Sequence, residues 1–337
     1  MKTKVAILVN KNMANSIFAQ ADLEYLAEFA DYNPIDELPD TMTLDFMREQ
    51  LKEAECAITC WGTPNITDEL IDCAPNLRFI AHGAGTVKNL IPPRMWKERK
   101  CRVTCNAPII AEAVAQTTLS FILTSLGQFW SISKSTRDGN WSGGEKSTFT
   151  TKTINGLTIG IVGASLVGQE VIKILTPFRC NLLLCDPYIS KYDAEALGVT
   201  LVDMDTLMKT SDIVTLHTPA NPDCYHIVNG DNLPLMKDGA LLINTSRGTV
   251  IDEPALIKEL ETGRIFACID VTDPEPPAKD HPFRSLPNVI LTPHIAGGHT
   301  VNGRQKLGRN SINTIYNYTV KGIVKFEVRE EMLSHMA

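Results

Sequence analysis

The sequence lacks an excess of basic charge. Its 337 residues contain 32 lysines and arginines against 39 aspartates and glutamates, which gives a formal net charge of −7. Proteins that hold nucleic-acid phosphates normally show a basic excess or a strong basic stripe, and this chain has neither. The sequence therefore predicts no nucleic-acid partner.

Long apolar runs, internal repeats and low-complexity tracts are also missing. No stretch approaches the roughly 20 apolar residues of a membrane span, and the apolar run Val5–Val9 is too short for a signal peptide. Hydrophobic residues make up 44% of the chain and charged residues 21%, which excludes disordered, collagenous and coiled-coil proteins. We expect a globular protein with no membrane partner, and about 150 residues per domain predicts two domains or one large one.

Cysteine patterns typical of disulfides or metal sites are absent. The nine cysteines are odd in number and include no Cys-x-x-Cys pair. Cys56 and Cys60 lie four apart, as do Cys101 and Cys105, but no histidine stands close to either pair. Because buried cysteine behaves as a small hydrophobe, we expect reduced thiols in a cytoplasmic protein and no metal site.

Short apolar runs alternate with helical patterns in two series. The first series predicts helices over Ile17–Phe29, Leu44–Leu51 and Thr67–Cys73, and strands over Val5–Val9, Cys56–Thr59, Phe79–Ala81 and Val103–Cys105. The second predicts helices over Val167–Phe178 and Pro254–Leu260, and strands over Leu157–Gly163, Asn181–Cys185, Asp212–Leu216, Ala240–Asn244, Ile265–Ile269 and Val289–Leu291. Such alternation predicts an α/β protein with two doubly wound parallel sheets.

Three further segments connect or follow the two series. A helical stretch with few charges, about Ile110–Thr136, is too polar for a membrane and too apolar for a surface, so we expect it to pack between domains or subunits. A Gly/Ser/Thr-rich stretch, Arg137–Asn155, breaks the pattern. The tail predicts a helix from Val301 to about Thr319 and a short strand such as Val324–Val328, which must pack onto an earlier sheet.

Polar residues follow almost every strand of the second series. The segments are Gly163–Gly168, Asp186, His217–Pro219, Asn244–Gly248, Asp270 and Thr292–His294. In an open parallel sheet, ligands bind outside the carboxyl ends of the strands, where the strand order reverses. The sequence therefore predicts a ligand site along this edge.

The first of these segments is a degenerate dinucleotide fingerprint. Gly163 and Gly168 keep the roles of the tight turn and of close helix packing, while Ser165 replaces the middle glycine. Asp186 lies 18 positions after Gly168, where a carboxylate would bind the ribose hydroxyls and repel a 2′-phosphate. This favours NAD(H) over NADP(H). The alternative is an ordinary strand-turn-helix with Asp186 as a helix cap.

Three other residues suit acid-base chemistry on an anion. Arg247 can bind a carboxylate through two parallel hydrogen bonds. The alternative is that Arg247 forms an ion pair at the surface. His294 follows Thr292-Pro293 at a strand end, and Glu275 lies in a proline-rich loop; each has a structural or surface alternative. A carboxylate in contact with His294 would hold one tautomer and make the ring a proton donor.

Several segments resemble one known family, the D-isomer-specific 2-hydroxyacid dehydrogenases, which include phosphoglycerate dehydrogenase, hydroxypyruvate and glyoxylate reductases and D-lactate dehydrogenase. The matching segments are Gly156-Leu-Thr-Ile-Gly-Ile-Val-Gly163, Asn244-Thr-Ser-Arg-Gly248, Asp270-Val-Thr-Asp-Pro-Glu-Pro276 and Leu291-Thr-Pro-His-Ile-Ala-Gly297. The similarity extends back through Val103-Thr-Cys-Asn-Ala-Pro108, Ala113-Val-Ala-Gln116 and His82-Gly-Ala-Gly-Thr86, and so covers about Phe79 to Thr300.

The resemblance implies a role for each matching residue. Arg247 would bind the substrate carboxylate, His294 would give its proton to the keto oxygen, and Glu275 would support the protonated ring. Backbone N–H groups of Ala84 and Gly85 would also bind the substrate, and Asp270 with groups near Thr245 would hold the nicotinamide amide. The implied cofactor-binding set is Gly163, Ser165, Leu166, Val167, Gly168, Asp186, His217, Thr218, Pro219, Thr245, Ser246, Arg247, Asp270, His294 and Gly297.

The resemblance also implies an architecture. A Rossmann-type cofactor domain, residues 106–299, would be inserted into a smaller flavodoxin-like substrate domain made of residues 1–105 and 300–337. Long helices around Ala111–Leu126 and Val301–Thr319 would bridge the domains, with the active site in the cleft. A homodimer through the cofactor domain is expected.

The chain departs from the family pattern at several positions. Ser165 replaces a glycine and Leu166 replaces a frequent arginine, so cofactor binding is expected to differ from that of relatives. Gln116 replaces a frequent glutamate. Lys88 stands where relatives usually have aspartate, and would either favour an acidic or phosphorylated substrate or be merely solvated. Trp61 and His82 are expected near the mouth of the cleft, where they would shape specificity.

Two functional hypotheses follow. The leading one is an NAD(H)-dependent D-2-hydroxyacid dehydrogenase that works as a 2-oxoacid reductase on a small carboxylic acid. The alternative is a dinucleotide-sensing scaffold of the corepressor type with weak or no dehydrogenase activity. Formate dehydrogenase shares the fold but carries glutamine where this chain has Glu275.

Overall fold

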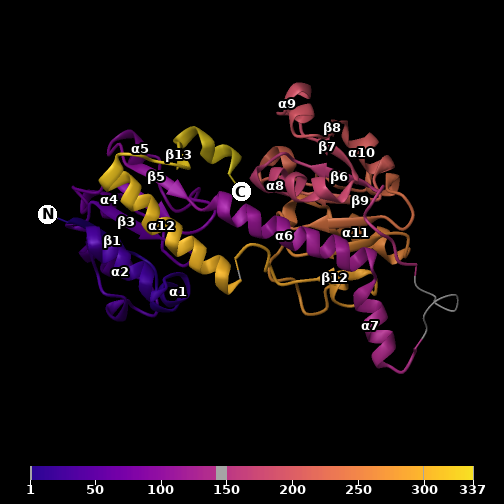
Figure 1. The fold of residues 1–337 in the computed structure, drawn as a ribbon, viewed down its shortest axis with the longest axis horizontal. Coiled ribbons are helices and arrows are strands. Elements are labelled where there is room, and N and C mark those ends of the chain that lie inside the picture. The colour runs from indigo at the N-terminus through magenta and orange to yellow at the C-terminus, as the bar shows by residue number, and fades with distance from the viewer. Residues whose placement is uncertain (1, 142–149, 299, 337) are drawn as a thin grey trace. The chain divides into compact units, whose positions relative to one another are not determined.

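The chain divides into two compact units. The computed structural model describes residues 2–141, 150–298 and 300–336 (Figure 1). The terminal unit comprises Met1–Ile110 and Gly297–Ala337, and the central unit comprises Ala111–Ala296. The boundaries thus follow Ile110 and Ala296, where the sequence predicted cuts after residues 105 and 299. Part of the predicted Gly/Ser/Thr-rich stretch, residues 142–149, lies outside the described residues.

The terminal unit contains a six-stranded sheet in the order β13-β5-β4-β3-β1-β2. Its strands are β1 (Thr3–Ile7), β2 (Ala30–Tyr32), β3 (Cys56–Thr59), β4 (Phe79–His82), β5 (Arg102–Cys105) and β13 (Glu327–Val328). The first five are parallel in the flavodoxin-like order 2-1-3-4-5. β13 pairs antiparallel with β5, with Val328 opposite Val103, so the tail joins the N-terminal sheet as predicted.

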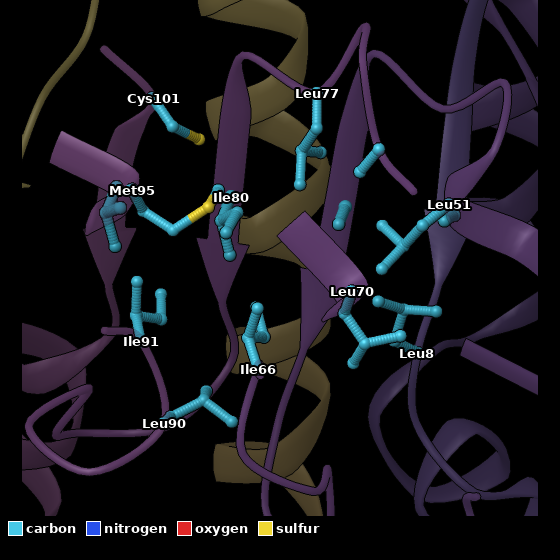
Figure 2. Close-up of a cluster of buried hydrophobic side chains, with 14 of the residues drawn as sticks. Leu8, Leu51, Ile66, Leu70, Leu77, Ile80, Leu90, Ile91, Met95 and Cys101 are labelled. Atoms are coloured by element: carbon cyan, nitrogen blue, oxygen red, sulfur yellow. The ribbon is translucent and has the colours of Figure 1, made fainter. Parts of the chain in front are cut away.

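Helices cover both faces of this sheet because its buried strands alternate their side chains between two cores. The helices are α1 (Lys11–Ile17), α2 (Gln20–Phe29), α3 (Leu44–Leu51), α4 (Asp68–Asp72), α5 (Arg94–Lys97) and α12 (Val301–Lys321). One core contains Ile80 with Leu51, Leu70 and Met95 from α3, α4 and α5 (Figure 2). The other core contains Ile312 of α12. The helix α12 lies behind the strands in Figure 2.

The helix predicted over Ile17–Phe29 is found as α2, which begins three residues later than predicted, and a separate helix, α1, precedes it. α1 ends at Ile17, and α2 begins at Gln20. The side chain of Asn10 caps α1 by accepting from the Met13 backbone N–H at 2.8 Å. The carboxylate of Asp22 accepts from the Ala19 backbone N–H at 3.0 Å and so starts α2. Local capping therefore overrides an apolar periodicity that runs across both helices.

The central unit contains a seven-stranded parallel sheet in the order β12-β11-β10-β9-β6-β7-β8. Its strands are β6 (Thr158–Val162), β7 (Asn181–Cys185), β8 (Thr200–Leu201), β9 (Ile213–Leu216), β10 (Leu241–Asn244), β11 (Phe266–Ile269) and β12 (Val289–Leu291). The prediction of six strands missed the two-residue edge strand β8. Because β6 pairs with both β7 and β9, the strand order reverses between β6 and β9. A dinucleotide site in such a sheet lies at this reversal.

Helices also cover both faces of the central sheet. They are α6 (Ala107–Leu126), α8 (Leu166–Leu175), α9 (Lys191–Ala196), α10 (Met204–Thr210) and α11 (Glu253–Glu261), whereas α7 (Phe129–Arg137) buries no residue. Ile122 of α6 and Val171 of α8 belong to one core, while Leu207 of α10 and Leu256 of α11 belong to the other. Because helices pack on both faces of the sheet, a ligand would bind outside the carboxyl ends of the strands.

The predicted long helix from Ile110 to Thr136 is interrupted. Gln128 has a left-handed backbone (φ +48°) between α6 and α7, so the single-helix prediction is wrong there. Among the described residues, α6 is the one helix long and apolar enough for a membrane span, so the expectation that this stretch is too polar is also wrong on composition. A third of its most apolar window is buried, and Phe121 and Ile122 pack in a core of the central unit.

Candidate dinucleotide and acid-base site

The turn after β6 is shaped by two glycines. Gly163 has a φ of +96°, and a Cβ there would lie 2.8 Å from the carbonyl oxygen of His217. A Cβ on Gly168 would lie only 2.1 Å from the carbonyl oxygen of Gly163. Ser165 stands at the middle fingerprint position and caps α8, its Oγ accepting from the Gly168 N–H at 3.3 Å. The serine therefore supports the turn through a hydrogen bond of its side chain, which the glycine of the usual fingerprint could not make.

Asp186 follows β7 and lies against the glycine turn. Its Oδ2 accepts from the Ala164 N–H at 2.7 Å, and its Oδ1 accepts from the Tyr188 N–H at 2.8 Å. The helices on either side are capped by Ser165 and Ser190, so the alternative of Asp186 as a helix cap is not the geometry found. The carboxylate stands beside the turn, where the fingerprint requires one.

His217 follows β9 on the other side of the strand reversal. The residue is only 2% exposed, its Nε2 lies 2.9 Å from Thr215 Oγ1, and its Nδ1 has no hydrogen-bond partner among the residues that the structure describes. Burial lowers the pKa of His217 to about 3, so the ring is neutral. Thr218 is also buried, and Pro219 is half-buried. An unpaired buried ring nitrogen beside the glycine turn is what a polar ligand group would satisfy.

This buried histidine predicts an acid-sensitive stability. The unfolded chain protonates the ring below about pH 6.5 whereas the folded ring stays neutral to about pH 3, so stability falls as the pH falls through that window. The measurement is the free energy of unfolding of the ligand-free protein, from urea titrations at about pH 7 and pH 5. Between these two pH values, the free energy of unfolding of His217→Gln is expected to fall by about 2 kcal/mol less than that of the wild type. A stability difference between the two proteins that is independent of pH would contradict this.

The segment after β10 holds Arg247 in a fixed turn. Asn244 Oδ1 accepts from the Ser246 N–H at 3.0 Å, and Asn244 Nδ2 donates to the Arg247 carbonyl at 2.9 Å. Thr245 Oγ1 lies 3.2 Å from Thr118 Oγ1 of α6. Burial lowers the pKa of the Arg247 guanidinium, and the charge of Glu275 opposes that shift. A guanidinium kept from water in this way favours an anionic ligand.

Asp270, which follows β11, organises the turn that carries His294. Its carboxylate accepts from Thr292 Oγ1 at 2.5 Å and from the N–H groups of Ile295 and Ala296 at 2.9 Å each. Its carbonyl accepts from the His294 N–H at 2.8 Å, and His294 adopts a φ of +51°. The role at the nicotinamide amide that the resemblance implies for Asp270 stays a prediction, and the sequence analysis missed this hydrogen-bond network. Its signal in the sequence is a Thr-Pro-His run at one strand end and an acid at the end of the neighbouring strand.

Glu275 and His294 are in contact. His294 Nδ1 lies 3.0 Å from both carboxylate oxygens of Glu275, and the two side chains are 43% and 41% exposed. The sequence predicted a carboxylate at this ring, and the structure brings these two residues together. With Nδ1 held by the carboxylate, Nε2 is the nitrogen left to exchange a proton with a ligand. The chemical capacity is that of a general acid-base pair.

The predicted residues of the terminal unit lie on that unit's own sheet edge. His82 is buried with Nδ1 2.9 Å from Thr59 Oγ1, and burial lowers its pKa to about 4, while its expected role in specificity stays a prediction. Trp61 is partly exposed and lies close to Gly298. Lys88 Nζ lies 3.5 Å from the carbonyl of Met336. The roles of Lys88, Trp61, Ala84, Gly85 and Gly297 stay predictions.

The fold and the site define a class. A doubly wound sheet in the order 3-2-1-4-5-6, with one further strand, carries a glycine turn at its strand reversal and a carboxylate after the next strand. These features are those of a Rossmann-type dinucleotide-binding domain. The unpaired His217 Nδ1 fits such a ligand, and the close backbone contacts at Gly163 and Gly168 give the tight turn that the fingerprint requires.

Comparisons with known proteins agree with this class. Residues 119–296 match the family described as D-isomer specific 2-hydroxyacid dehydrogenase, NAD binding domain. The chain is 34% identical to glyoxylate reductase of Thermofilum pendens over 81% of its own length and 82% of that protein. It is 32% identical to D-3-phosphoglycerate dehydrogenase of Methanocaldococcus jannaschii over 87% of its own length, and it spans about half of that relative (54%).

A solved structure supports the fold independently. A phosphoglycerate oxidoreductase from Rhizobium etli superposes with a TM-score of 0.82 at 23% identity, covering 98% of this chain and 99% of that one. At this identity the likeness shows the fold alone. Together with the family match, these findings show that the chain belongs to the D-isomer-specific 2-hydroxyacid dehydrogenases, a family of NAD-binding oxidoreductases.

Proposed function

We propose that the protein is an NAD(H)-dependent D-2-hydroxyacid dehydrogenase that acts as a 2-oxoacid reductase with His294 as its proton donor. The observation that carries the proposal is the contact between His294 Nδ1 and the Glu275 carboxylate at 3.0 Å. This pair lies in the same unit as the glycine turn that fits a dinucleotide. A binding scaffold would have no need of a partly exposed histidine held by a carboxylate.

The residues that would hold the cofactor are those around the strand reversal. Gly163, Ser165 and Gly168 would face the pyrophosphate, Asp186 the ribose and His217 the remaining polar groups. When bound, NADH supplies the hydride that reduces the 2-oxo carbon.

The chain's own residues then supply binding and proton transfer. Arg247, whose turn is held by Asn244, binds the substrate carboxylate as a bidentate fork. His294 gives the proton at Nε2 to the keto oxygen, and Glu275 balances the charge of the ring before that transfer. In the oxidative direction His294 takes the proton back.

The position of Asp186 favours NAD(H) over NADP(H), because its charge would repel a 2′-phosphate. Asp186→Asn keeps an acceptor for a backbone N–H but removes this charge. We expect it to lower the preference for NADH over NADPH by on the order of tenfold, about 1.4 kcal/mol. The measurement is kcat/KM with each cofactor, and the control is Asp231→Asn, an equal charge change at an exposed loop residue. An unchanged preference would remove Asp186 from cofactor discrimination.

The substrate proposed is a small 2-oxoacid. Relatives named glyoxylate reductase and hydroxypyruvate reductase match the chain at 34% and 33% identity, each over about four-fifths of its own length (82% and 80%). The test is a spectrophotometric screen of NADH oxidation with glyoxylate, hydroxypyruvate, pyruvate, phosphohydroxypyruvate and bulkier 2-oxoacids. Turnover with at least one acid is expected. Protein that binds NADH and reduces none of them would favour the corepressor-type scaffold.

We also propose a cytoplasmic homodimer formed through the central unit. Its helix α7 exposes Phe129 and Trp130, both about 60% accessible, which a monomer would leave in water. The nine cysteines are free thiols, which suits a reducing compartment. Light scattering of the purified chain at micromolar concentration is expected to give twice the monomer mass.

A further inference from the structure

The central unit contains a second histidine-carboxylate pair that the proposed reaction does not use. Glu253 is the first residue of α11 and is only 8% exposed. Its Oε2 lies 3.2 Å from His281 Nε2, and its Oε1 accepts from the Asp273 backbone N–H at 2.9 Å. A buried carboxylate is costly, and burial raises the pKa of Glu253, while its two partners oppose that shift.

The partner histidine is itself held in one orientation. His281 Nδ1 accepts from the Phe283 N–H at 3.3 Å, so the proton of the neutral ring is on Nε2 and is donated to Glu253. The His281 ring also packs edge-on against Phe283 with centroids 4.7 Å apart, and Phe283 is buried in the core. The carboxylate of Glu253 is therefore anchored to the core on one side and to a loop on the other.

The loop held by Glu253 is the one that carries Glu275. Asp273 lies two residues before Glu275, whose carboxylate contacts His294. The same backbone also abuts the turn of Arg247: a Cβ on Gly248 would lie 2.1 Å from the Thr272 carbonyl carbon and 2.6 Å from Asp273 N. Glu253 thus accepts a hydrogen bond from the backbone at the point where the Glu275 loop packs against the Arg247 turn.

We propose that Glu253, oriented by His281, is a positioning residue that holds the Asp273 backbone so that Glu275 meets His294 Nδ1. The proposal rests on the proposed function insofar as the Glu275–His294 pair performs acid-base chemistry. Glu253 touches no reacting atom in this account and acts only through Glu275. A purely structural role would change stability alone, whereas a positioning role changes the state of His294 and the turnover number.

The test compares variants that separate stability from positioning. Glu253→Met removes the acceptor for Asp273 N–H at similar volume and is expected to lower kcat by about 10- to 100-fold, with NADH affinity unchanged. Glu253→Gln keeps an acceptor oxygen and is expected to retain most of the turnover. The double variant Glu253→Met/His281→Phe replaces both partners by apolar groups and is expected to restore stability but not kcat. Glu261→Gln, an exposed glutamate at the other end of α11, is the matched control.

A second readout does not depend on activity. Nitrogen-15 NMR of the His294 ring is expected to show the proton on Nδ1 in the wild type and a mixture of tautomers in Glu253→Met, as in Glu275→Gln. If the double variant regains kcat, or if His294 keeps its wild-type tautomer in both Glu253→Met proteins, the positioning proposal is wrong. If the wild type reduces no 2-oxoacid, the proposed function fails instead, and the NMR comparison still decides the role of Glu253.

Discussion

His294→Gln is expected to lower the turnover number for 2-oxoacid reduction by about 10²- to 10⁴-fold while the protein still binds NADH. Glutamine is similar in size and polarity, but it has no ring nitrogen that can carry and release a proton near neutral pH. In the structure Nδ1 of His294 is held by Glu275, so the loss falls on the proton exchanged at Nε2. Because the loss affects the chemical step, kcat falls together with kcat/KM.

Steady-state kinetics and an NADH fluorescence titration check this expectation together. His226→Gln is the matched control, since His226 lies in the same unit and its ring stacks on Tyr225 with ring centroids 3.9 Å apart. Glu275→Gln is expected to cost less than His294→Gln, because the imidazole remains. Turnover by His294→Gln equal to that of the wild type would remove His294 from proton transfer.

Gly168→Ala is expected to abolish detectable NADH binding and to destabilise the central unit by about 1–3 kcal/mol. An added Cβ would lie 2.1 Å from the Gly163 carbonyl oxygen, so the turn must open before the methyl group fits. Opening the turn displaces Gly163 from its approach to His217 and breaks the Ser165 cap on the Gly168 N–H. Both changes disturb the surface on which the pyrophosphate would lie.

Calorimetric titration with NADH and urea unfolding measure the two effects separately. Gly230→Ala is the control in the same unit, because a Cβ there would meet nothing closer than Ala255 Cβ at 3.8 Å. We expect that control to bind NADH as the wild type does. Gly168→Ala protein with wild-type NADH affinity would mean that the dinucleotide does not lie on this turn.

The sheets were predictable because buried parallel strands leave a strong apolar pattern. Runs such as Asn181–Cys185 and Val289–Leu291 coincide with β7 and β12, since both faces of a strand in such a sheet are covered. β8 was missed because two residues, Thr200 and Leu201, carry no periodicity. The helix predicted from Ile17 began too early, and the helix predicted from Ile110 to Thr136 is split, because the backbone leaves the helical conformation at Phe18 and at Gln128.

The candidate site was predictable to the extent that strand ends and motifs reveal it. The contact between Glu275 and His294 followed from matching an acid to a base, and the resemblance to the family supplied the motifs that contain them. Sequence patterns could not predict the hydrogen bonds of Asp270 with residues 292–296 or that of Glu253 with the Asp273 backbone. Such hydrogen bonds join residues about twenty positions apart, and only the folded backbone determines which N–H group each buried carboxylate meets. The burial of His82 likewise depends on Thr59 of a neighbouring strand.

In the proposed reaction, hydride passes to C2 of a 2-oxoacid while His294 protonates the oxygen. The most direct test uses NADH deuterated at C4 of the nicotinamide ring, the 2-oxoacid reduced fastest in the screen, and NMR with chiral chromatography of the product. The expected product is a D-2-hydroxyacid with deuterium at C2, formed by the wild type and barely formed by His294→Gln. A product of L configuration, a product without deuterium from either face-specific label, or equal yields from the two proteins would contradict the account.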